Sequence, residues 1–209
     1  MVEYWRCPEC EVVFAPELMG WSLEKFREKI YNDEYSEVDP DYLEVRPCKQ
    51  ASNVEEVFGH AKSEIRHLDY GGGNGLLSKA LRKKGWDSYS YDPFHQMTFP
   101  SVASDLVTAI EVFEHVPDPN LLFSELCSLL ISEGAVVFTT LLSDGYIFPY
   151  EGVKWWYIAP RNGHISIWSK KSLEVMVRKY KFNARTSPLG FHILFDKRLP
   201  SWCDKVKFR

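Results

Sequence analysis

The residue types between His67 and Leu77 could bind a small ligand at a turn between a strand and a helix. An apolar stretch ends at Asp69, and four glycines then fall within five positions: Gly71, Gly72, Gly73 and Gly75. Glycine lets the backbone adopt φ > 0 and approach a ligand closely. In α/β proteins, a glycine turn leading into a helix is where nucleotide-like ligands bind.

The spacing of these glycines separates the possible ligands. A dinucleotide-binding Gly-x-Gly-x-x-Gly motif starting at Gly71 needs glycine at position 76, which is Leu76. A phosphate-binding loop needs Lys-Ser/Thr after its last glycine, where this chain has Leu76-Leu77. The pattern that fits is Asp-x-Gly-x-Gly-x-Gly from Asp69. It resembles motif I of the class I (Rossmann-like) S-adenosylmethionine-dependent methyltransferases. A glycine-rich turn without a ligand is the alternative interpretation.

This resemblance implies where the cofactor contacts lie. Asp69 would face the amino end of the cofactor's methionine. Asp92 follows 23 residues later, at the end of the next predicted strand, and would bind the ribose hydroxyls. Asp92-Pro93 is also a common turn pair, so a purely structural acid is the alternative. The implied cofactor-binding residues are Asp69, Gly71, Gly73, Gly75, Asp92, Pro93 and Glu111.

The segment Glu111–Pro119 resembles a Glu-His segment of small-molecule O-methyltransferases and permits two interpretations. In ubiquinone-pathway and small-RNA 2′-O-methyltransferases, Glu-x-x-Glu-His and a later histidine bind a divalent metal. The matching residues here are Glu111, Glu114, His115 and His164. Such ligands suit Mn²⁺, Fe²⁺ or Zn²⁺ better than Mg²⁺, and the metal would lower the pKa of an acceptor hydroxyl. In metal-free relatives, the same residues support the pocket or supply a general base.

A second distinctive block runs from Trp155 to Ser166 and ends in Gly-His-x-Ser. It resembles a segment before the penultimate helix of natural-product methyltransferases. We expect residues 142–164 to form a lid over the acceptor, with His164 as a catalytic base beside His115. The nearby aromatic residues are Tyr146, Phe148, Trp155, Trp156 and Tyr157. They could stack on a flat acceptor, or they could simply pack the insertion onto the core.

Cys7 and Cys10 form one zinc knuckle, whereas a structural zinc site needs four ligands. Their segment resembles the second half of a zinc ribbon that precedes some sugar and natural-product methyltransferases. The first half is absent. We interpret the knuckle as vestigial. Completion by Cys48 or a histidine, and a site shared between chains, remain open. A redox Cys-x-x-Cys is less favoured because no thioredoxin-type βαβ unit surrounds it.

The elements that must position these residues alternate in type. Predicted strands at 65–70, 86–91, 105–110 and 135–141 alternate with helices at 76–84, 119–131 and 171–180, and a hairpin spans 182–195. We therefore predict a three-layer, doubly wound α/β fold with a mostly parallel sheet and an antiparallel final strand. Only twelve residues separate Asp92 from Asp105, so the family's third strand is reduced or our strand numbering is off by one.

This pattern divides the chain into two predicted parts. Residues 64–209 form the predicted methyltransferase domain, and residues 1–63 form a small N-terminal cap with the Cys-x-x-Cys segment. In the cap we expect helices at 23–35 and 53–62. The second would begin with a capping box at Ser52 and Glu55.

Bulk composition narrows the class of protein. The chain has 209 residues, 45% of them hydrophobic and 26% charged, with a net charge of −4. Net acidity counts against a nucleic-acid coat or a binder of anionic membranes. We expect no membrane span and no signal peptide. Five scattered cysteines do not form a disulfide framework, so a reducing cytoplasm is expected.

The predicted function is methyl transfer from S-adenosylmethionine to a hydroxyl of a small molecule: a sugar, a nucleotide-sugar, a polyketide or a phenol. Oxygen is preferred because no Asn/Asp-Pro-Pro-Tyr/Phe segment follows the strand at 105–110. Three alternatives remain: a metal-assisted RNA 2′-O-methyltransferase, a non-catalytic cofactor-binding module, and a zinc-organised interaction protein.

Overall fold

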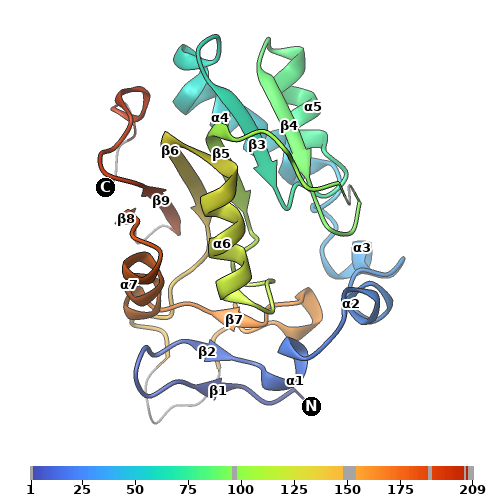
Figure 1. Ribbon diagram of the computed structural model, residues 1–209. Helices are drawn as coiled ribbons and strands as arrows, with labels where there is room; N and C mark the ends of the chain where they lie inside the picture. The colour runs from blue at the N-terminus through green and yellow to red at the C-terminus, as the bar shows by residue number, and fades with distance from the viewer. Residues whose placement is uncertain (1, 96–97, 148–153, 188–189, 205, 207–209) are drawn as a thin grey trace.

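The centre of the molecule is a six-stranded sheet in the order β4-β3-β5-β6-β9-β8 (Figure 1). The structure is a computed structural model that describes residues 2–95, 98–147, 154–187, 190–204 and 206. The six strands are β3 Arg66–Tyr70, β4 Asp87–Tyr91, β5 Ser104–Ile110, β6 Leu130–Thr139, β8 Asn183–Thr186 and β9 Phe191–Phe195. Strands β4, β3, β5 and β6 are parallel, and β9 is antiparallel to both neighbours. The predicted sheet is confirmed.

Helices cover both faces of the sheet, as its alternating residues require. On β5, Leu106 packs with α4 (Val45–Phe58) and α5 (Leu76–Lys83). Its neighbour Val107 packs with α6 (Pro119–Leu129) and α7 (Lys170–Lys179). Successive strand residues point to opposite faces, so one buried strand supplies both cores. The predicted three-layer, doubly wound architecture is confirmed.

The connection after β4 resolves one open question of the sequence. Among the described residues between Asp92 and Ala103, none extends the sheet with a further strand. β4 is therefore the edge strand, and the chain passes directly to β5 on the other side of β3. The short spacing between Asp92 and Asp105 therefore reflects a shortened connection between β4 and β5, and not an error in the strand numbering.

The N-terminal region contains both helices and strands. Helices α1 (Pro16–Met19), α2 (Leu23–Lys29) and α3 (Tyr35–Val38) precede α4. The short strands β1 (Trp5–Arg6) and β2 (Val13–Phe14) form an antiparallel sheet with β7 (Ser166–Ile167). This sheet lies near the chain's N-terminus in Figure 1 and joins the start of the chain to the segment that follows the predicted lid. Short 3₁₀ turns are η1 Gly59–Ala61, η2 Pro160–Asn162 and η3 Ser201–Cys203.

Both helices predicted in the cap have wrong boundaries. The helix expected at 23–35 ends at Lys29, and Tyr35 begins the separate helix α3. Helix α4 begins at Val45 and passes through Ser52, so Ser52 does not cap a helix. The Ser52 hydroxyl instead donates to the Cys48 carbonyl one turn earlier, at 3.2 Å. A serine can make this bond inside a helix, and the local sequence does not distinguish it from a cap.

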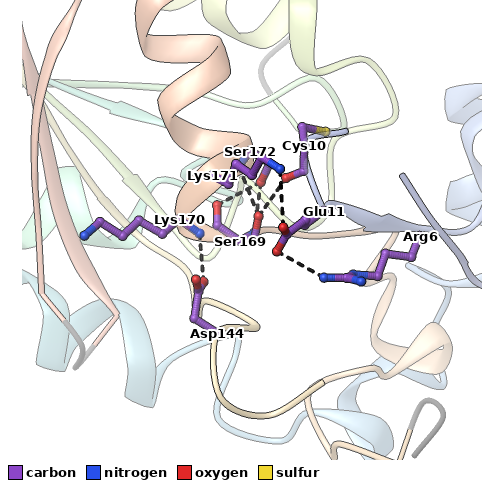
Figure 2. A network of polar contacts seen from close by, with 8 residues as sticks. All are labelled: Arg6, Cys10, Glu11, Asp144, Ser169, Lys170, Lys171 and Ser172. Atoms are coloured by element: carbon purple, nitrogen blue, oxygen red, sulfur yellow. Dashed lines mark hydrogen bonds and ion pairs between the residues drawn. The ribbon is translucent and has the colours of Figure 1, made fainter. Parts of the chain in front are cut away.

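The turn between β1 and β2 is anchored to the start of α7 (Figure 2). The Ser169 hydroxyl donates to the Cys10 carbonyl at 2.9 Å and also accepts the Ser172 amide at 3.0 Å, which caps α7. Glu11 pairs with Lys171 at 3.4 Å. The Lys170 amide donates to Asp144 at 2.7 Å. Thus the N-terminal hairpin, the loop after β6 and α7 share one polar network.

No described helix combines the length and apolar character needed to cross a membrane.

Candidate functional site

The glycine loop between β3 and α5 is tightly packed on one side and open on the other. The Gly71 and Gly72 amides donate to the Tyr91 carbonyl at 2.8 and 3.1 Å. A Cβ on Gly71 (φ +73°) would lie 2.5 Å from Val112 Cγ2. A Cβ on Gly73 would meet no atom within 4 Å. The loop is thus held against β4 and the segment after β5 while its Gly73 side faces open space.

Asp92, at the end of β4, holds the neighbouring loops together. Its Oδ2 accepts the Gly73 amide at 3.0 Å, and its Oδ1 accepts the Phe94 amide at 2.8 Å. His95 Nδ1 lies 3.1 Å from the same Oδ1. The His95 amide also donates to Oδ1, at 3.2 Å, so the free lone pair of this carboxylate is on Oδ2. The side chain also lines the cavity described below. The turn role of Asp92 therefore leaves room for a ligand.

Asp69, at the end of β3, is 3% exposed and also lines the cavity. Its Oδ1 accepts a hydrogen bond from the Thr108 hydroxyl at 2.8 Å. Burial raises the pKa of Asp69 to about 7, and the charge of Asp92 acts in the same direction, while the Thr108 hydrogen bond opposes both. Asp69 is thus a buried carboxyl whose charge depends on pH near neutrality.

Glu111 follows β5 in a left-handed conformation with φ 52°. Its amide donates to Thr139 Oγ1 at 2.9 Å, and the Thr139 hydroxyl donates to Glu111 Oε1 at 2.7 Å. A non-glycine residue in this region of backbone space stores strain of about 1–3 kcal/mol and is common at functional sites. The neighbouring β6 therefore fixes the start of the Glu111–Pro119 segment.

The structure gathers three of the four predicted metal ligands. One ligand atom from each of Glu114, His115 and His164 lies within 4.8 Å of the others, and no other such group of three or more occurs among the described residues. Glu114 is 0% exposed. Its Oε1 accepts the Tyr157 hydroxyl at 2.5 Å, whereas its Oε2 is buried without a hydrogen-bond partner. Burial raises the pKa of Glu114 to about 8.

Backbone carbonyls fix both histidines of this cluster. His115 Nδ1 lies 3.1 Å from the Gly163 carbonyl, and His164 Nδ1 lies 2.5 Å from the Tyr157 carbonyl. A carbonyl only accepts, so each Nδ1 carries the proton and each Nε2 keeps its lone pair. Burial lowers the pKa of His115 to about 3 and also lowers the pKa of His164. Both imidazoles are therefore neutral bases or ligands at pH 7.

The other predicted ligands lie apart from this cluster. Glu111 is not in the group of three, since its carboxylate accepts from Thr139. Cys7 and Cys10 lie at the β1–β2 turn, and Cys48 lies exposed on α4. Neither Cys7 nor Cys10 has a third candidate ligand beside it in the described part of the chain. A vestigial knuckle at this turn stays a prediction, with zinc binding as its alternative.

A cavity of about 850 Å³ joins the glycine loop to the histidine pair. It is lined on one side by Asp69, Gly73 and Asp92, and on the other by His115 and His164. Its aromatic walls are Trp21, Phe26, Tyr31, Tyr35, Tyr42, Tyr91, Phe94, Trp156 and Tyr157. Most of these come from the N-terminal region and the loop after β4, which the sequence analysis did not include in the site.

The predicted aromatic lid is only partly at this cavity. Trp156, which is 74% exposed, and Tyr157 line it. Tyr146 and Trp155 do not, and their rings stack on each other at 4.6 Å. They pack within the insertion, as the alternative interpretation holds. Phe148 lies outside the described residues. Among the cap residues, the helical spacing of Phe26 and Tyr31 is the signal in the sequence, and such spacing by itself indicates only one face of a helix.

Residues 42–187 match the model of a family described as a methyltransferase domain. The chain belongs to this methyltransferase family. It is 27% identical over 173 residues to a ubiquinone biosynthesis O-methyltransferase from Nitrosomonas europaea, covering 68% of this chain and 72% of that enzyme. It is 26% identical over 140 residues to the enzyme of the same name from Bordetella avium, covering 53% of this chain and 58% of that one.

Solved structures share the fold at low identity. A Burkholderia thailandensis 1,6-didemethyltoxoflavin-N1-methyltransferase, solved with S-adenosylhomocysteine, has a TM-score of 0.53 and 13% identity over 92% of this chain and 97% of that one. A mitomycin 7-O-methyltransferase has a TM-score of 0.58 and 12% identity, and the match covers 84% of this chain and 60% of that one. The chain thus spans less than two thirds of the length of several relatives. The expected class I methyltransferase fold and S-adenosylmethionine-dependent enzyme class are confirmed.

Proposed function

We propose that the protein transfers the methyl group of S-adenosylmethionine to a hydroxyl of a small aromatic acceptor. The observation that carries this proposal is the single cavity that connects the glycine loop to the paired histidines. Its aromatic walls favour a flat acceptor through stacking and exclusion of water. Among the acceptors considered, a phenol or an aromatic polyketide therefore fits better than a sugar or a nucleotide-sugar.

The cofactor lies along the carboxyl edge of the sheet in this proposal. The Asp92 carboxylate binds the ribose through Oδ2, which keeps a lone pair beside its bond from the Gly73 amide. Asp69 faces the ammonium of the methionine part. Gly71 and Gly73 let the backbone approach the cofactor, while Pro93 and Glu111 border it. Gly75 does not line the cavity and instead lies at the N-cap position of α5, with φ 74°. This arrangement points the sulfonium methyl toward the histidine pair.

His164 takes the acceptor proton as the methyl group transfers. Its Nε2 is the unprotonated nitrogen because Nδ1 donates to the Tyr157 carbonyl. His115 is the weaker base of the two, since burial holds its pKa at about 3, far below the working pH. We assign to His115 the orientation of the acceptor oxygen. Positioning supplies most of the rate, and the base adds roughly 10²–10⁴-fold.

A divalent metal at the same cluster is the second candidate. Glu114 Oε2 is buried without a partner, and both histidines present an unprotonated Nε2. These donors fit Mn²⁺, Fe²⁺ or Zn²⁺, with carbonyls orienting the imidazoles as they commonly do in metal sites. When bound, the ion would lower the pKa of the acceptor hydroxyl. Glu111 would then support the segment from outside the ligand group.

An oxygen acceptor is preferred over nitrogen. The curated relatives described above are named O-methyltransferases, and Glu111-Val112-Phe113-Glu114 occupies the place of the Asn/Asp-Pro-Pro-Tyr/Phe segment. An RNA acceptor fits less well because the net charge is −4. We further propose that residues 1–63 form the cap and 64–209 the catalytic domain, with residues 142–164 as the lid. Cys7 and Cys10 are a vestigial knuckle in this proposal.

The test is calorimetric titration with S-adenosylmethionine and S-adenosylhomocysteine, on metal-free protein and again with Mg²⁺, Mn²⁺ or Zn²⁺. Micromolar cofactor binding supports the proposal, and a phenol panel against a sugar panel then tests the acceptor. His164→Ala should lower turnover by at least about 10²-fold with unchanged cofactor affinity. Activity that survives chelators excludes the metal candidate. Folded protein that binds neither cofactor overturns the proposal.

A further inference from the structure

Beneath the glycine loop, four side chains form a continuous hydrogen-bonded chain across three adjacent strands. His67 on β3 is 0% exposed. Its Nδ1 lies 2.8 Å from the Ser88 hydroxyl on β4, and its Nε2 lies 3.0 Å from the Thr108 hydroxyl on β5. The Thr108 hydroxyl lies 2.8 Å from Asp69 Oδ1. The chain therefore ends at the carboxyl that faces the cofactor cavity.

The chemistry of its members fixes the direction of this chain. An ionised carboxylate only accepts, so the Thr108 hydroxyl donates to Asp69. The Thr108 oxygen can then accept from His67 Nε2–H, which leaves Nδ1 to accept from the Ser88 hydroxyl. A neutral histidine supplies this combination of one donor and one acceptor. No atom of His67 reaches the cavity, so any effect on the cofactor passes through Thr108.

We propose that His67 is a positioning residue for cofactor binding, which orients the Asp69 carboxylate through Thr108. This inference rests on the proposed role of Asp69 at the cofactor's ammonium. A donated hydrogen bond from His67 polarises the Thr108 hydroxyl and strengthens its bond to Asp69. It also limits rotation of both side chains, so the carboxylate is held in place before the cofactor arrives.

Few other groups near these hydrogen-bonded side chains can act as partners for Asp69. From β4, Ser90 Oγ is buried without a partner, and it approaches the same side of Gly72 as Asp69 Oδ2 does. The charged group that acts on Asp69 is Asp92. Against His67 packs the Trp86 ring, edge to face at 5.9 Å. When Asp69 is protonated, every bond of the chain can reverse, with the His67 proton on Nδ1. The ionised and the protonated form of Asp69 thus correspond to the two opposite directions of the hydrogen bonds along these four side chains.

The test measures the dissociation constant of S-adenosylmethionine by calorimetry for matched His67 variants of the full chain. In His67→Gln the amide nitrogen replaces Nε2 and reaches Thr108. In His67→Asn the shorter amide replaces Nδ1 and reaches Ser88 only. We expect His67→Asn and His67→Leu to raise the dissociation constant about tenfold, and His67→Gln to stay within about threefold of wild type. His192→Leu is the control. It removes a buried histidine on β9 that takes no part in this series of hydrogen bonds, so the dissociation constant of S-adenosylmethionine should not change.

A double-mutant cycle tests the path through Thr108. Thr108→Val removes the link, so adding His67→Leu to it should weaken binding no further. Equal affinity for S-adenosylmethionine in wild type, His67→Asn and His67→Leu overturns the inference. Additive effects of Thr108→Val and His67→Leu overturn the route through Thr108. If His67→Leu does not fold, the comparison of His67→Gln with His67→Asn decides. Failure of the wild-type protein to bind the cofactor is a different result, which overturns the proposed function itself.

Discussion

At the scale of single residues, Gly72 is constrained by space rather than by backbone conformation. Its φ is not positive, yet a Cβ there would lie 2.4 Å from Asp69 Oδ2 and 2.4 Å from Ser90 Oγ. Both neighbours are short side chains, Asp69 is buried and the Ser90 Oγ atom is buried too, so neither can swing away easily. The glycine therefore leaves the Asp69 carboxyl in its position.

We expect Gly72→Ala to lower the free energy of unfolding by about 1–3 kcal/mol and to weaken S-adenosylmethionine binding, because the added methyl must displace Asp69. Urea unfolding and calorimetry measure the two effects. Gly20→Ala is the matched control. The added Cβ would lie 3.6 Å from the Glu17 carbonyl, an ordinary contact, so stability should change by no more than about 0.5 kcal/mol. Equal effects of the two substitutions would contradict this account of the loop.

The charge of Asp69 makes a second prediction at this scale. Burial raises its pKa to about 7, so the carboxyl is largely protonated at pH 5.5 and ionised at pH 7.5. Only the ionised form attracts the cofactor's ammonium. The dissociation constant of S-adenosylmethionine should therefore fall by about tenfold between these pH values. Asp69→Asn should bind weakly at both, and a wild-type constant that does not vary with pH would refute the assignment.

At the scale of elements, the start of α7 joins three segments that are distant in the sequence. Ser169 caps α7 and at the same time donates to the Cys10 carbonyl of the β1–β2 turn (Figure 2). The β2–β7 pairing adds a second link nearby. Because β7 begins two residues after His164, these contacts also hold one member of the histidine cluster in place.

We expect Ser169→Ala to lower the free energy of unfolding by about 0.5–2 kcal/mol, the usual effect of removing a helix cap. Hydrogen exchange should also become faster in the β1–β2 turn, because the anchor at Cys10 is lost. Ser128→Ala provides a control, since Ser128 is bonded to the Glu125 carbonyl within its own helix turn. If the turn exchanges at the wild-type rate in Ser169→Ala, the strand pairing and the Glu11–Lys171 ion pair are enough to anchor the hairpin.

Elements differ in how far the sequence alone predicts them. The central sheet follows from local patterns: apolar strands such as β5, glycine spacing after Asp69, and helices with one apolar face. The sheet of β1, β2 and β7 does not, because strands of two residues carry no periodicity and Val13 pairs with the distant Ile167. The same limit applies to the site. Glu114 and His115 are adjacent in sequence, whereas the approach of Tyr31 to His115 depends on tertiary packing.

At the scale of the whole molecule, the cavity is a product of several parts rather than of the catalytic sheet alone. The glycine loop and Asp92 form its floor, and α2, α3 and the start of α4 contribute walls. The Arg46 guanidinium pairs with both oxygens of Asp39 at 2.7 and 2.8 Å beside this cavity. The Tyr31 hydroxyl reaches His115 at 3.1 Å. The N-terminal region and the histidine cluster are thus in direct contact.

Enclosing so many titratable groups makes the stability of the whole molecule depend on pH in two directions. Burial lowers the pKa of His67 and His115 from 6.5 to about 3. Below pH 6.5 the unfolded chain therefore binds more protons than the folded one, and stability is lost as pH falls. Burial raises the pKa of Asp69 from 3.8 to about 7 and of Glu114 from 4.5 to about 8. For these groups the folded state binds more protons, so stability is lost as pH rises toward 8.

The two trends oppose each other between about pH 4.5 and 6.5, and only the carboxyl trend remains from 6.5 to 8. We expect the unfolding free energy without cofactor, measured by urea titration, to be nearly flat between about pH 5 and 6.5, to fall below pH 4.5 and to decline from pH 6.5 to 8. Glu114→Gln removes one of the buried carboxyls and should flatten the decline above pH 6.5. Bound S-adenosylmethionine should flatten it further, because its ammonium stabilises the ionised form of Asp69. A free energy that rises from pH 6.5 to 8 would show that both carboxyls are already ionised in the folded protein, and that their burial is compensated by groups other than those identified here.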